Sequence, residues 1–352
     1  MPTTPPPTET SPPRPDDYRV RAYRPGDETA ILDLFRRAFH VERSAERWRW
    51  AYADNPYGHH RISLAVDSEG HIVAHYAGYP VRVWCGTGDG EGGESWECQH
   101  VGDTMTDPEV RGVGRGTRLL LTRTVRHFYD TWCTGKVAFN FGVNTGKIQR
   151  FSRRTAGALR LEDVVHRVRP LTGGAAWPAP GRLARRLGGW RVERVGDFDD
   201  RFDAFFARVR GAYRFLVERD RRYLAWRYGA FPEEGVSAWA VSRRGRLVGW
   251  SVLRRQEERL VWGDGLFDPA EPEAPGLLLA EATAAAEHQG AQAIEGWFPE
   301  RPAWWDERLR ALGFEQRPEP QDLGVVYVPF EVEPGERMRE SLYYTKGDFD
   351  LF

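Results

Sequence analysis

The feature that most constrains the fold is an internal repeat. Residues 48–56 read WRWAYADNP, and residues 224–232 read LAWRYGAFP. Three positions agree at an offset of 176 residues, so that Trp50, Tyr52 and Pro56 match Trp226, Tyr228 and Pro232. The expected order of strands and helices around these segments also repeats. Repetition at both levels indicates a duplicated unit, so the 352 residues are expected to form two related domains.

Each unit is expected to have a mixed α/β (α+β) fold. Hairpin-like strands come early in each unit and a strand–helix–strand pattern comes late, which argues against a doubly wound parallel sheet. We therefore predict two tandem domains, each with a central mixed sheet flanked by helices. The expected order along the chain is a proline-rich, disordered leader (1–17), a first domain (18–169), a Gly/Pro/Ala-rich linker (170–190), a second domain (191–330) and a C-terminal tail (331–352) that docks on the body.

Composition excludes several classes of protein. The chain has 50 Lys+Arg and 51 Asp+Glu, so it is not a strongly basic nucleic-acid binder. It contains no apolar run of the roughly 18 residues that a membrane span needs. Nearly all the basic residues are Arg, which is typical of a GC-rich genome and also suits bidentate anion binding. Three cysteines without metal-ligand spacing favour a reduced, cytoplasmic protein without a metal.

A glycine-rich turn between a strand and a helix carries the chemistry. The run 98–106 predicts a strand, and Arg111-Gly112-Val113-Gly114-Arg115-Gly116 leads into an amphipathic helix. The first N–H groups of a helix lack partners, and the helix dipole is positive at that end, so an anion is expected at this turn. Arg111 and Arg115 would add charge-assisted hydrogen bonds. Neither the ATP-binding P-loop nor the dinucleotide fingerprint matches this spacing.

At this turn the sequence resembles the GNAT superfamily of acyl-CoA-dependent N-acyltransferases. The family motif Q/R-x-x-G-x-G/A follows the fourth strand, and Arg111, Gly114 and Gly116 occupy its fixed positions. The strand expected at 137–141 and the helix expected from Asn144 to Gly157 also agree with the family pattern. The resemblance covers residues 18–169. It implies a tandem-GNAT arrangement in which only the N-terminal half has the cofactor motif.

The resemblance implies where an acyl-CoA would bind. The pyrophosphate would be held by the backbone N–H groups of Val113, Gly114, Arg115, Gly116 and Thr117. The strand end at Met105 and Thr106 would pair with the pantetheine arm. Asn140 and Asn144 would lie near the thioester, although Asn144 would equally serve as a helix cap. The implied cosubstrate is acetyl-CoA or another acyl-CoA, with no metal.

The second unit departs from this pattern. Its corresponding strand, at 260–267, runs into the turn 268–276, which carries three carboxylates and no R-x-x-G-x-G. Negative charges beside a helix start would repel a pyrophosphate. Residues 303–314 still resemble the last helix of the family with its closing Gly-Phe. Residues 191–330 are therefore expected to form a GNAT-like domain without a cofactor site.

The strand before the glycine turn offers three side chains that handle protons: Glu97, His100 and Asp103. Asp103 is the preferred base or amine anchor because it lies nearest the turn, and a paired structural carboxylate is the equal alternative. His100 has a suitable ordinary pKa, but a core histidine is the commoner role. The resemblance to tandem relatives adds Phe352, whose C-terminal carboxylate would act as base. The family's usual tyrosine acid is missing, and Phe151 is the aromatic residue in that segment.

We therefore expect an acyl-CoA-dependent N-acyltransferase, in its simplest form an N-acetyltransferase acting on a small-molecule amine, with no nucleic-acid or membrane partner. One alternative is a transferase that takes its acyl group from aminoacyl-tRNA, as some tandem GNAT-like peptide-bridge ligases do. The intact glycine turn and the neutral charge speak against it. The other alternative is a non-catalytic acyl-CoA-binding protein, which the missing tyrosine motivates. The acceptor and the oligomeric state do not follow from the sequence.

Overall fold

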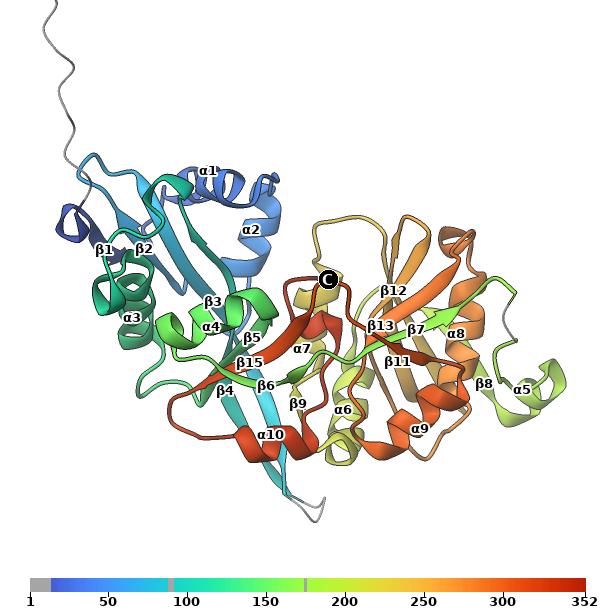
Figure 1. Ribbon diagram of the computed structural model, residues 1–352. Coiled ribbons are helices and arrows are strands. Elements are labelled where there is room, and N and C mark those ends of the chain that lie inside the picture. The colour runs from blue at the N-terminus through green and yellow to red at the C-terminus, as the bar shows by residue number, and fades with distance from the viewer. Residues whose placement is uncertain (1–13, 88–91, 174–175) are drawn as a thin grey trace, which may run out of the picture.

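The computed structural model describes residues 14–87, 92–173 and 176–352. Two mixed sheets lie side by side, one in each half of the molecule, and the C-terminal tail runs between them (Figure 1). Helices flank both sheets. This arrangement confirms the predicted α/β class with two tandem domains. None of the helices in these ranges is long and apolar enough to cross a membrane.

The first half begins with a short 3-10 turn at Pro15–Asp17, and the rest of the expected leader, up to residue 13, lies outside the described residues. Its strands are β1 (Arg19–Ala22), β2 (Ile62–Val66), β3 (Ile72–Gly86), β4 (Gly93–Thr106), β5 (Phe139–Thr145) and β6 (Leu159–Asp163). Its helices are α1 (Glu28–Phe39), α2 (Ala45–Tyr52), α3 (Leu120–Trp132) and α4 (Gly146–Ala156).

The second half repeats the same order of elements. Its strands are β8 (Trp190–Arg194), β9 (Phe215–Val217), β10 (Val236–Arg243), β11 (Arg246–Gln256), β12 (Arg259–Phe267), β13 (Ala293–Trp297) and β14 (Glu315–Arg317). Its helices are α6 (Asp200–Tyr213), α7 (Arg221–Leu224), α8 (Ala274–Ala284) and α9 (Ala303–Ala311). The segment expected to link the halves carries a short helix, α5 (Arg182–Gly188), and the tail carries α10 (Gly335–Ser341).

Strands cross between the two halves. The short strand β9 of the second half pairs antiparallel with β3 of the first sheet, and each half also gives one strand to the sheet of the other. The first sheet has the order β1-β2-β3-β4-β5-β15-β6, in which β15 (Leu323–Pro329) comes from the end of the chain. The second has the order β14-β7-β13-β12-β11-β10-β8, in which β7 (His166–Pro170) directly follows the first half. Both exchanged strands are antiparallel to their neighbours. Each half therefore needs the other to complete its sheet, which the sequence analysis did not anticipate.

The repeated tryptophans meet where the two halves touch. Trp50 Nε1 donates to the carbonyl of Trp226 at 2.8 Å, and Trp226 Nε1 donates to the carbonyl of Trp50 at 2.8 Å. Their rings stack with centroids 5.3 Å apart. Reciprocal contacts of this kind are the signature of a two-fold interface between like surfaces. The halves of this single chain therefore face each other as the subunits of a symmetric dimer would.

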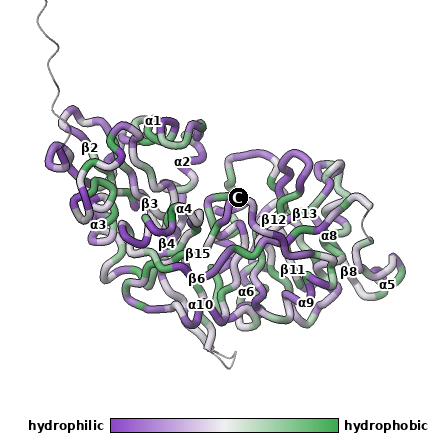
Figure 2. Tube along the Cα trace, viewed as in Figure 1, coloured by the Kyte–Doolittle hydropathy of each residue, from purple (hydrophilic) through white to green (hydrophobic). Residues whose placement is uncertain are grey.

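Hydrophobic residues follow the strands of both sheets (Figure 2). One continuous cluster of buried side chains runs through both halves, and its largest members include Trp250, Trp262 and Trp305. The tail contributes Tyr343, Phe349 and Phe352 to the same cluster, and each is at least 98% buried. Burial of this apolar surface is what holds the tail against the body.

Candidate functional site

A cavity opens where two central strands of the first sheet diverge. β4 and β5 pair in parallel only at Gln99–Asn140 and His100–Phe141. Beyond these residues they separate around a cavity of about 580 Å³. The cavity is lined by the ends of both strands, by α3 and α4, by the end of α1, by the exchanged strand β15 and by the tail residue Asp350. A volume of this size suits a small-molecule or cofactor site.

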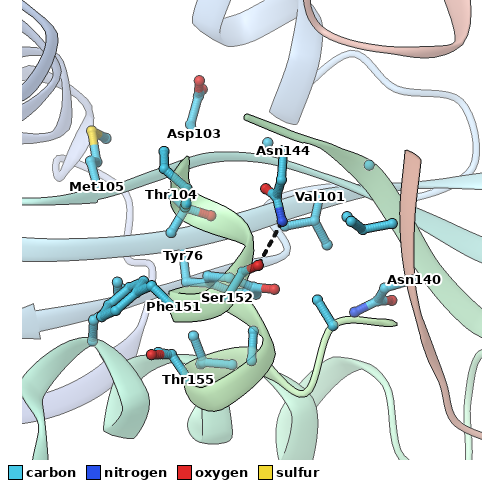
Figure 3. A pocket seen from close by; sticks show the side chains of 18 of the residues that line it. Tyr76, Val101, Asp103, Thr104, Met105, Asn140, Asn144, Phe151, Ser152 and Thr155 are labelled. Atoms are coloured by element: carbon cyan, nitrogen blue, oxygen red, sulfur yellow. Dashed lines mark hydrogen bonds between the residues drawn. The ribbon is translucent and has the colours of Figure 1, made fainter. Parts of the chain in front are cut away.

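The lining is largely apolar on the side of α3 and α4. Tyr76, Val101, Phe151 and Thr155 surround this part of the cavity (Figure 3). The Tyr76 hydroxyl is not free, because it lies 3.2 Å from the Tyr129 hydroxyl, and burial raises its pKa. Tyr76 is therefore already engaged within the core.

An irregularity in β4 shapes the opposite side. The pairing of β3 with β4 shifts register between His75 and Ala77, and Asp103 adopts the left-handed conformation with φ of 51°. Such bulges re-aim side chains next to functional sites. Here the bulge turns Asp103 away from α4, as Figure 3 shows. The carboxylate then accepts a hydrogen bond from the Tyr52 hydroxyl at 2.8 Å and forms an ion pair with Arg43.

The environment of Asp103 keeps it ionised. Burial raises the pKa of this carboxyl, but the Arg43 charge, together with His75 and the Tyr52 hydrogen bond, outweighs burial and lowers the pKa below its ordinary value. Only 7% of its side chain is exposed. Asp103 is thus a well-paired carboxylate at the rim of the cavity, consistent with the structural alternative in the sequence analysis.

The glycine turn leads into α3 beside the cavity. Gly114 and Gly116 have φ of 86° and 57°, and a Cβ atom on Gly114 would collide with the backbone carbonyl of Arg118. Only glycine fits this turn without strain. Within the described residues, the N–H groups of Gly114, Arg115 and Gly116 donate no hydrogen bond to the protein. They remain available for an anion.

The structure places the other cofactor-binding candidates around the same space. Met105, Thr106, Arg111, Asn140 and Asn144 all line the cavity. The Arg111 guanidinium donates to the carbonyls of Thr106 (3.2 Å) and Ala38 (3.3 Å), which ties the turn to β4 and α1. Val113 and Thr117 lie in the turn itself.

The two asparagines have partners of their own. Asn140 donates to Cys133 Sγ at 3.3 Å, and Asn144 donates to the Ser152 hydroxyl at 2.8 Å (Figure 3). Thr145, rather than Asn144, is the residue that precedes α4, and its side chain makes no capping hydrogen bond. The Asn144–Ser152 bond instead ties the middle of α4 to the end of β5.

Three of the catalytic candidates, Glu97, His100 and Phe352, are not among the residues that line the cavity. Glu97 is half exposed and pairs with Arg61 at 2.6 Å near the other end of β4. Phe352 is buried, and its carbonyl oxygen accepts a hydrogen bond from Arg47 at 3.2 Å. Its ring packs against Tyr228 and Phe231 of the second half.

His100 is fully buried beneath the cavity. Its ring stacks on Tyr79 with centroids 4.7 Å apart, and neither ring nitrogen has a hydrogen-bond partner among the described residues. Burial, helped by the nearby Arg227 charge, lowers the pKa of His100 to about 3, so the ring is neutral. The nearest carboxylate is that of Asp350, 4.0 Å from Nε2.

Two groups of side chains at the cavity were not predicted from the sequence. Asp350 lies in the tail, two residues before the Phe352 that was considered, and its side chain reaches the cavity. Arg150 and Arg154 line a second hollow of about 520 Å³ beside α4, and Phe151 borders both hollows. An i,i+4 spacing places the two arginines on one face of the helix. That spacing was visible in the sequence, whereas the position of Asp350 depends on how the tail docks.

Comparison with known proteins agrees with this geometry. Residues 19–144 match the family model described as the acetyltransferase (GNAT) domain. These residues form a GNAT domain. A search of curated protein sequences finds no match to the chain.

Solved structures are similar in fold over 90–92% of the chain. A conserved Enterococcus faecalis protein, described as a probable N-acyltransferase, is 14% identical with a TM-score of 0.62 over 90% of this chain and 73% of its own. A GCN5-related N-acetyltransferase from Kribbella flavida is 16% identical with a TM-score of 0.60 over 90% and 71%. Saccharomyces cerevisiae N-myristoyltransferase with bound myristoyl-CoA is 11% identical with a TM-score of 0.54 over 92% and 83%. At these identities the similarity shows a shared fold.

Proposed function

We propose that this protein is an acyl-CoA-dependent N-acyltransferase, in the simplest case an N-acetyltransferase, that acts on a small-molecule amine. The observation that carries the proposal is the cavity between β4 and β5. It joins a glycine turn with available amides on one side to a pair of carboxylates, Asp103 and Asp350, on the other. This is the arrangement that a transfer from an anionic carrier to an amine requires.

The glycine turn supplies the anion site. The N–H groups of Gly114, Arg115 and Gly116 and the start of α3 would hold the pyrophosphate of CoA. Arg150 and Arg154 border the adjoining hollow, where they would hold the 3′-phosphate. The amides of the glycine turn and the two α4 arginines lie on the side of the sheet covered by α3 and α4. The nucleotide part of CoA would therefore remain near the protein surface.

The diverging strands β4 and β5 would supply the site for the pantetheine arm of CoA. β4 pairs with β3 along its length but with β5 only at two positions, so the edge of β4 at Thr104–Thr106 is free on one side. A pantetheine arm carries amides that would pair with this edge. Bound acyl-CoA would supply a thioester, and its carbonyl carbon would lie between Asn140 and the carboxylates.

The acceptor would approach from the side of α1 and the tail. Asp103 and Asp350 give this side a negative potential, which favours a positively charged amine. Because the tail covers this side and Ala38 and Phe39 of α1 border it, the space is that of a small molecule. Three free cysteines fit a reducing, cytoplasmic setting.

The test is binding followed by turnover. Isothermal titration calorimetry with acetyl-CoA and with CoA should give saturable binding, and release of free CoA thiol should follow when a panel of small amines is added. Absence of binding to either ligand would overturn the proposal. Binding without release across the panel would favour the non-catalytic alternative, and stimulation by charged tRNA would favour the aminoacyl-tRNA alternative.

A further inference from the structure

We infer that Asp350, contributed by the C-terminal tail, is the carboxylate that takes the proton from the acceptor amine, and that Asp103 serves to hold the site together. This inference rests on the proposed function and assigns a catalytic residue within it. Four observations carry it: the duplication of the Asp103 cluster, the way the tail crosses both halves, the exposure of Asp350 and the state of His100.

The cluster around Asp103 occurs twice in the molecule. Arg219 and Tyr228 stand 176 residues after Arg43 and Tyr52, and they bind Asp264 of β12 as the earlier pair binds Asp103. Arg219 Nε lies 3.1 Å from Asp264 Oδ1, and the Tyr228 hydroxyl donates to Oδ2 at 2.7 Å. The pairing of β11 with β12 is irregular beside Asp264, as that of β3 with β4 is beside Asp103.

In the second half this cluster has no access to a substrate. Asp264 and Arg219 are completely buried, and the same Arg219 also binds Asp348 of the tail at 2.7 Å. In a region that nothing can enter, such a cluster has a structural role. It ties the bulged strand to the segment that carries the arginine, just before a helix. By symmetry, the Arg43–Tyr52–Asp103 cluster does the same in the first half. The catalytic group should therefore be a side chain that the open half has and the closed half lacks.

The tail supplies that difference. A glycine precedes each aspartate, Gly102 before Asp103 and Gly263 before Asp264. A Cβ atom on Gly102 would lie 2.7 Å from Asp350 Oδ2, whereas a Cβ on Gly263 would collide with the ring of Phe352. The tail thus places a carboxylate over the open site and an aromatic ring over its closed counterpart.

Asp350 is suited to accept a proton. Its side chain is 31% exposed and lines the cavity, so a bound amine would reach it directly or through one water. Burial and the neighbouring Asp103 charge raise the pKa of Asp350 to about 6, although Arg43 and Arg227 act in the opposite direction. It is therefore ionised at neutral pH and is a stronger base than an ordinary aspartate. Asp103, whose pKa is lowered, is a weaker one.

His100 is a positioning residue in this arrangement. Its neutral ring has one N–H to donate, both nitrogens lack partners among the described residues, and Asp350 is 4.0 Å away. A small movement of the tail would bring the two into hydrogen-bond contact. The aromatic neighbours Tyr79, Phe141 and Phe349 hold the imidazole in place from three sides.

The proton balance of the step is simple. The acceptor enters as an ammonium ion and gives one proton to the Asp350 carboxylate. The nitrogen lone pair then forms the C–N bond with the thioester carbonyl carbon, and the C–S bond breaks with its electron pair on sulfur. The second nitrogen proton passes to that sulfur to give the CoA thiol. Asp350 returns its proton to solvent, so the net products are amide, thiol and one released proton.

The test compares Asp350→Asn with Leu351→Ala, a neighbour in the same tail whose side chain is 40% exposed. We expect Asp350→Asn to bind CoA as the wild type does but to lower kcat at least about 100-fold, the usual range for loss of a general base. Leu351→Ala should keep full activity. In the wild type, kcat/KM should rise with pH through about 6 and then level off, and this rise should disappear in Asp350→Asn.

A second readout does not depend on the acceptor. The His100 ring resonance should shift with a midpoint near pH 6 in the wild type, because the charge of Asp350 changes beside it, and should stay constant in Asp350→Asn. Retention of turnover within twofold by Asp350→Asn, or a His100 titration unchanged by it, would overturn the inference. Loss of CoA binding by the wild-type protein would instead overturn the proposed function.

Discussion

The two halves of this chain share a fold, an interface and a buried Arg–Tyr–Asp cluster, and the cavity of about 580 Å³ lies in the first of them. In the first half, β4 and β5 diverge beyond His100 and the space between them stays open. In the second half, β12 and β13 pair at four positions, and Trp262 with Phe298 and Trp305 fills the corresponding region. The glycine turn of the first half is replaced by a turn whose carboxylates bind arginines. The two halves therefore share a scaffold, and the proposed ligand site lies in the first.

The comparison separates conserved architecture from function within one molecule. Whatever is present in both halves is explained by the fold, and whatever is present only in the open half is a candidate for chemistry. By this criterion the glycine turn, the α4 arginines and Asp350 are the candidates for the proposed site. Asp103, which has a counterpart in Asp264, is a candidate for the scaffold even though it borders the cavity.

The strongest test of this division concerns stability. Asp264→Asn would leave the fully buried Arg219 with Asp348 as its remaining carboxylate partner. Breaking a buried ion pair costs about 3–5 kcal/mol. Asp103→Asn should cost less, about 1–2 kcal/mol, because Arg43 is 17% exposed and the cavity admits water. Urea unfolding followed by tryptophan fluorescence measures both, and a larger loss for Asp103→Asn would contradict the comparison.

The next test concerns the glycine turn. Gly116→Asp should weaken CoA binding at least about 100-fold, because a carboxylate placed among the amides repels the pyrophosphate. Gly245→Asp is a matched control, since Gly245 in the β10–β11 turn also has positive φ and open space around its Cα. It should lose the same small amount of stability and bind CoA normally. Equal binding losses in the two variants, measured by calorimetry, would show that the turn is not the anion site.

A smaller effect is expected at α4. The double substitution Arg150→Gln with Arg154→Gln should weaken CoA binding about tenfold, as expected for loss of charge-assisted contacts to a phosphate. Binding of 3′-dephospho-CoA should be unaffected, because that ligand lacks the group that the arginines hold. If both ligands lose affinity equally, the arginines act on another part of the cofactor or on the fold.

Much of the fold followed from the sequence because it rests on local patterns. The repeat, the strand before the glycine turn and the helix ending at Gly157 all depend on periodicity, turn residues and capping, and the structure confirms them. The exchange of β7 and β15 did not follow, because each is a short strand of five or seven residues, and a pattern that short does not specify which sheet it joins. The strand pattern specifies that a partner exists, not which half supplies it.

The candidate site divides in the same way. The glycine motif and the cavity-lining positions Met105, Thr106 and Arg111 were predicted because they lie in one continuous segment. The position of Asp350 depends on a tail that packs through Phe349 and Phe352 against residues far away in the sequence. The pairing of Arg43 with Asp103 likewise joins residues 60 positions apart. Such groups come together only when the whole molecule folds.

The smallest expected effect is a change in the free energy of unfolding when Asp350 is replaced, and its sign is what distinguishes the alternatives. The pKa of Asp350 is raised from its ordinary value to about 6 in the folded protein, so this carboxyl costs stability that grows as the pH rises from about 4 to about 6 and is fully present at higher pH. Asp350→Asn should therefore stabilise the protein by about 1 kcal/mol at pH 8, less than the full equivalent of the pKa change because the side chain is partly exposed. The gain should vanish below about pH 4, where the carboxyl is protonated in both folded and unfolded chains. Thermal unfolding at pH 8 and pH 4, with Leu351→Ala as control, measures the difference. Loss of stability at pH 8 would mean that Asp350 is held by favourable partners, like Asp264, rather than kept in a strained position that serves a reaction.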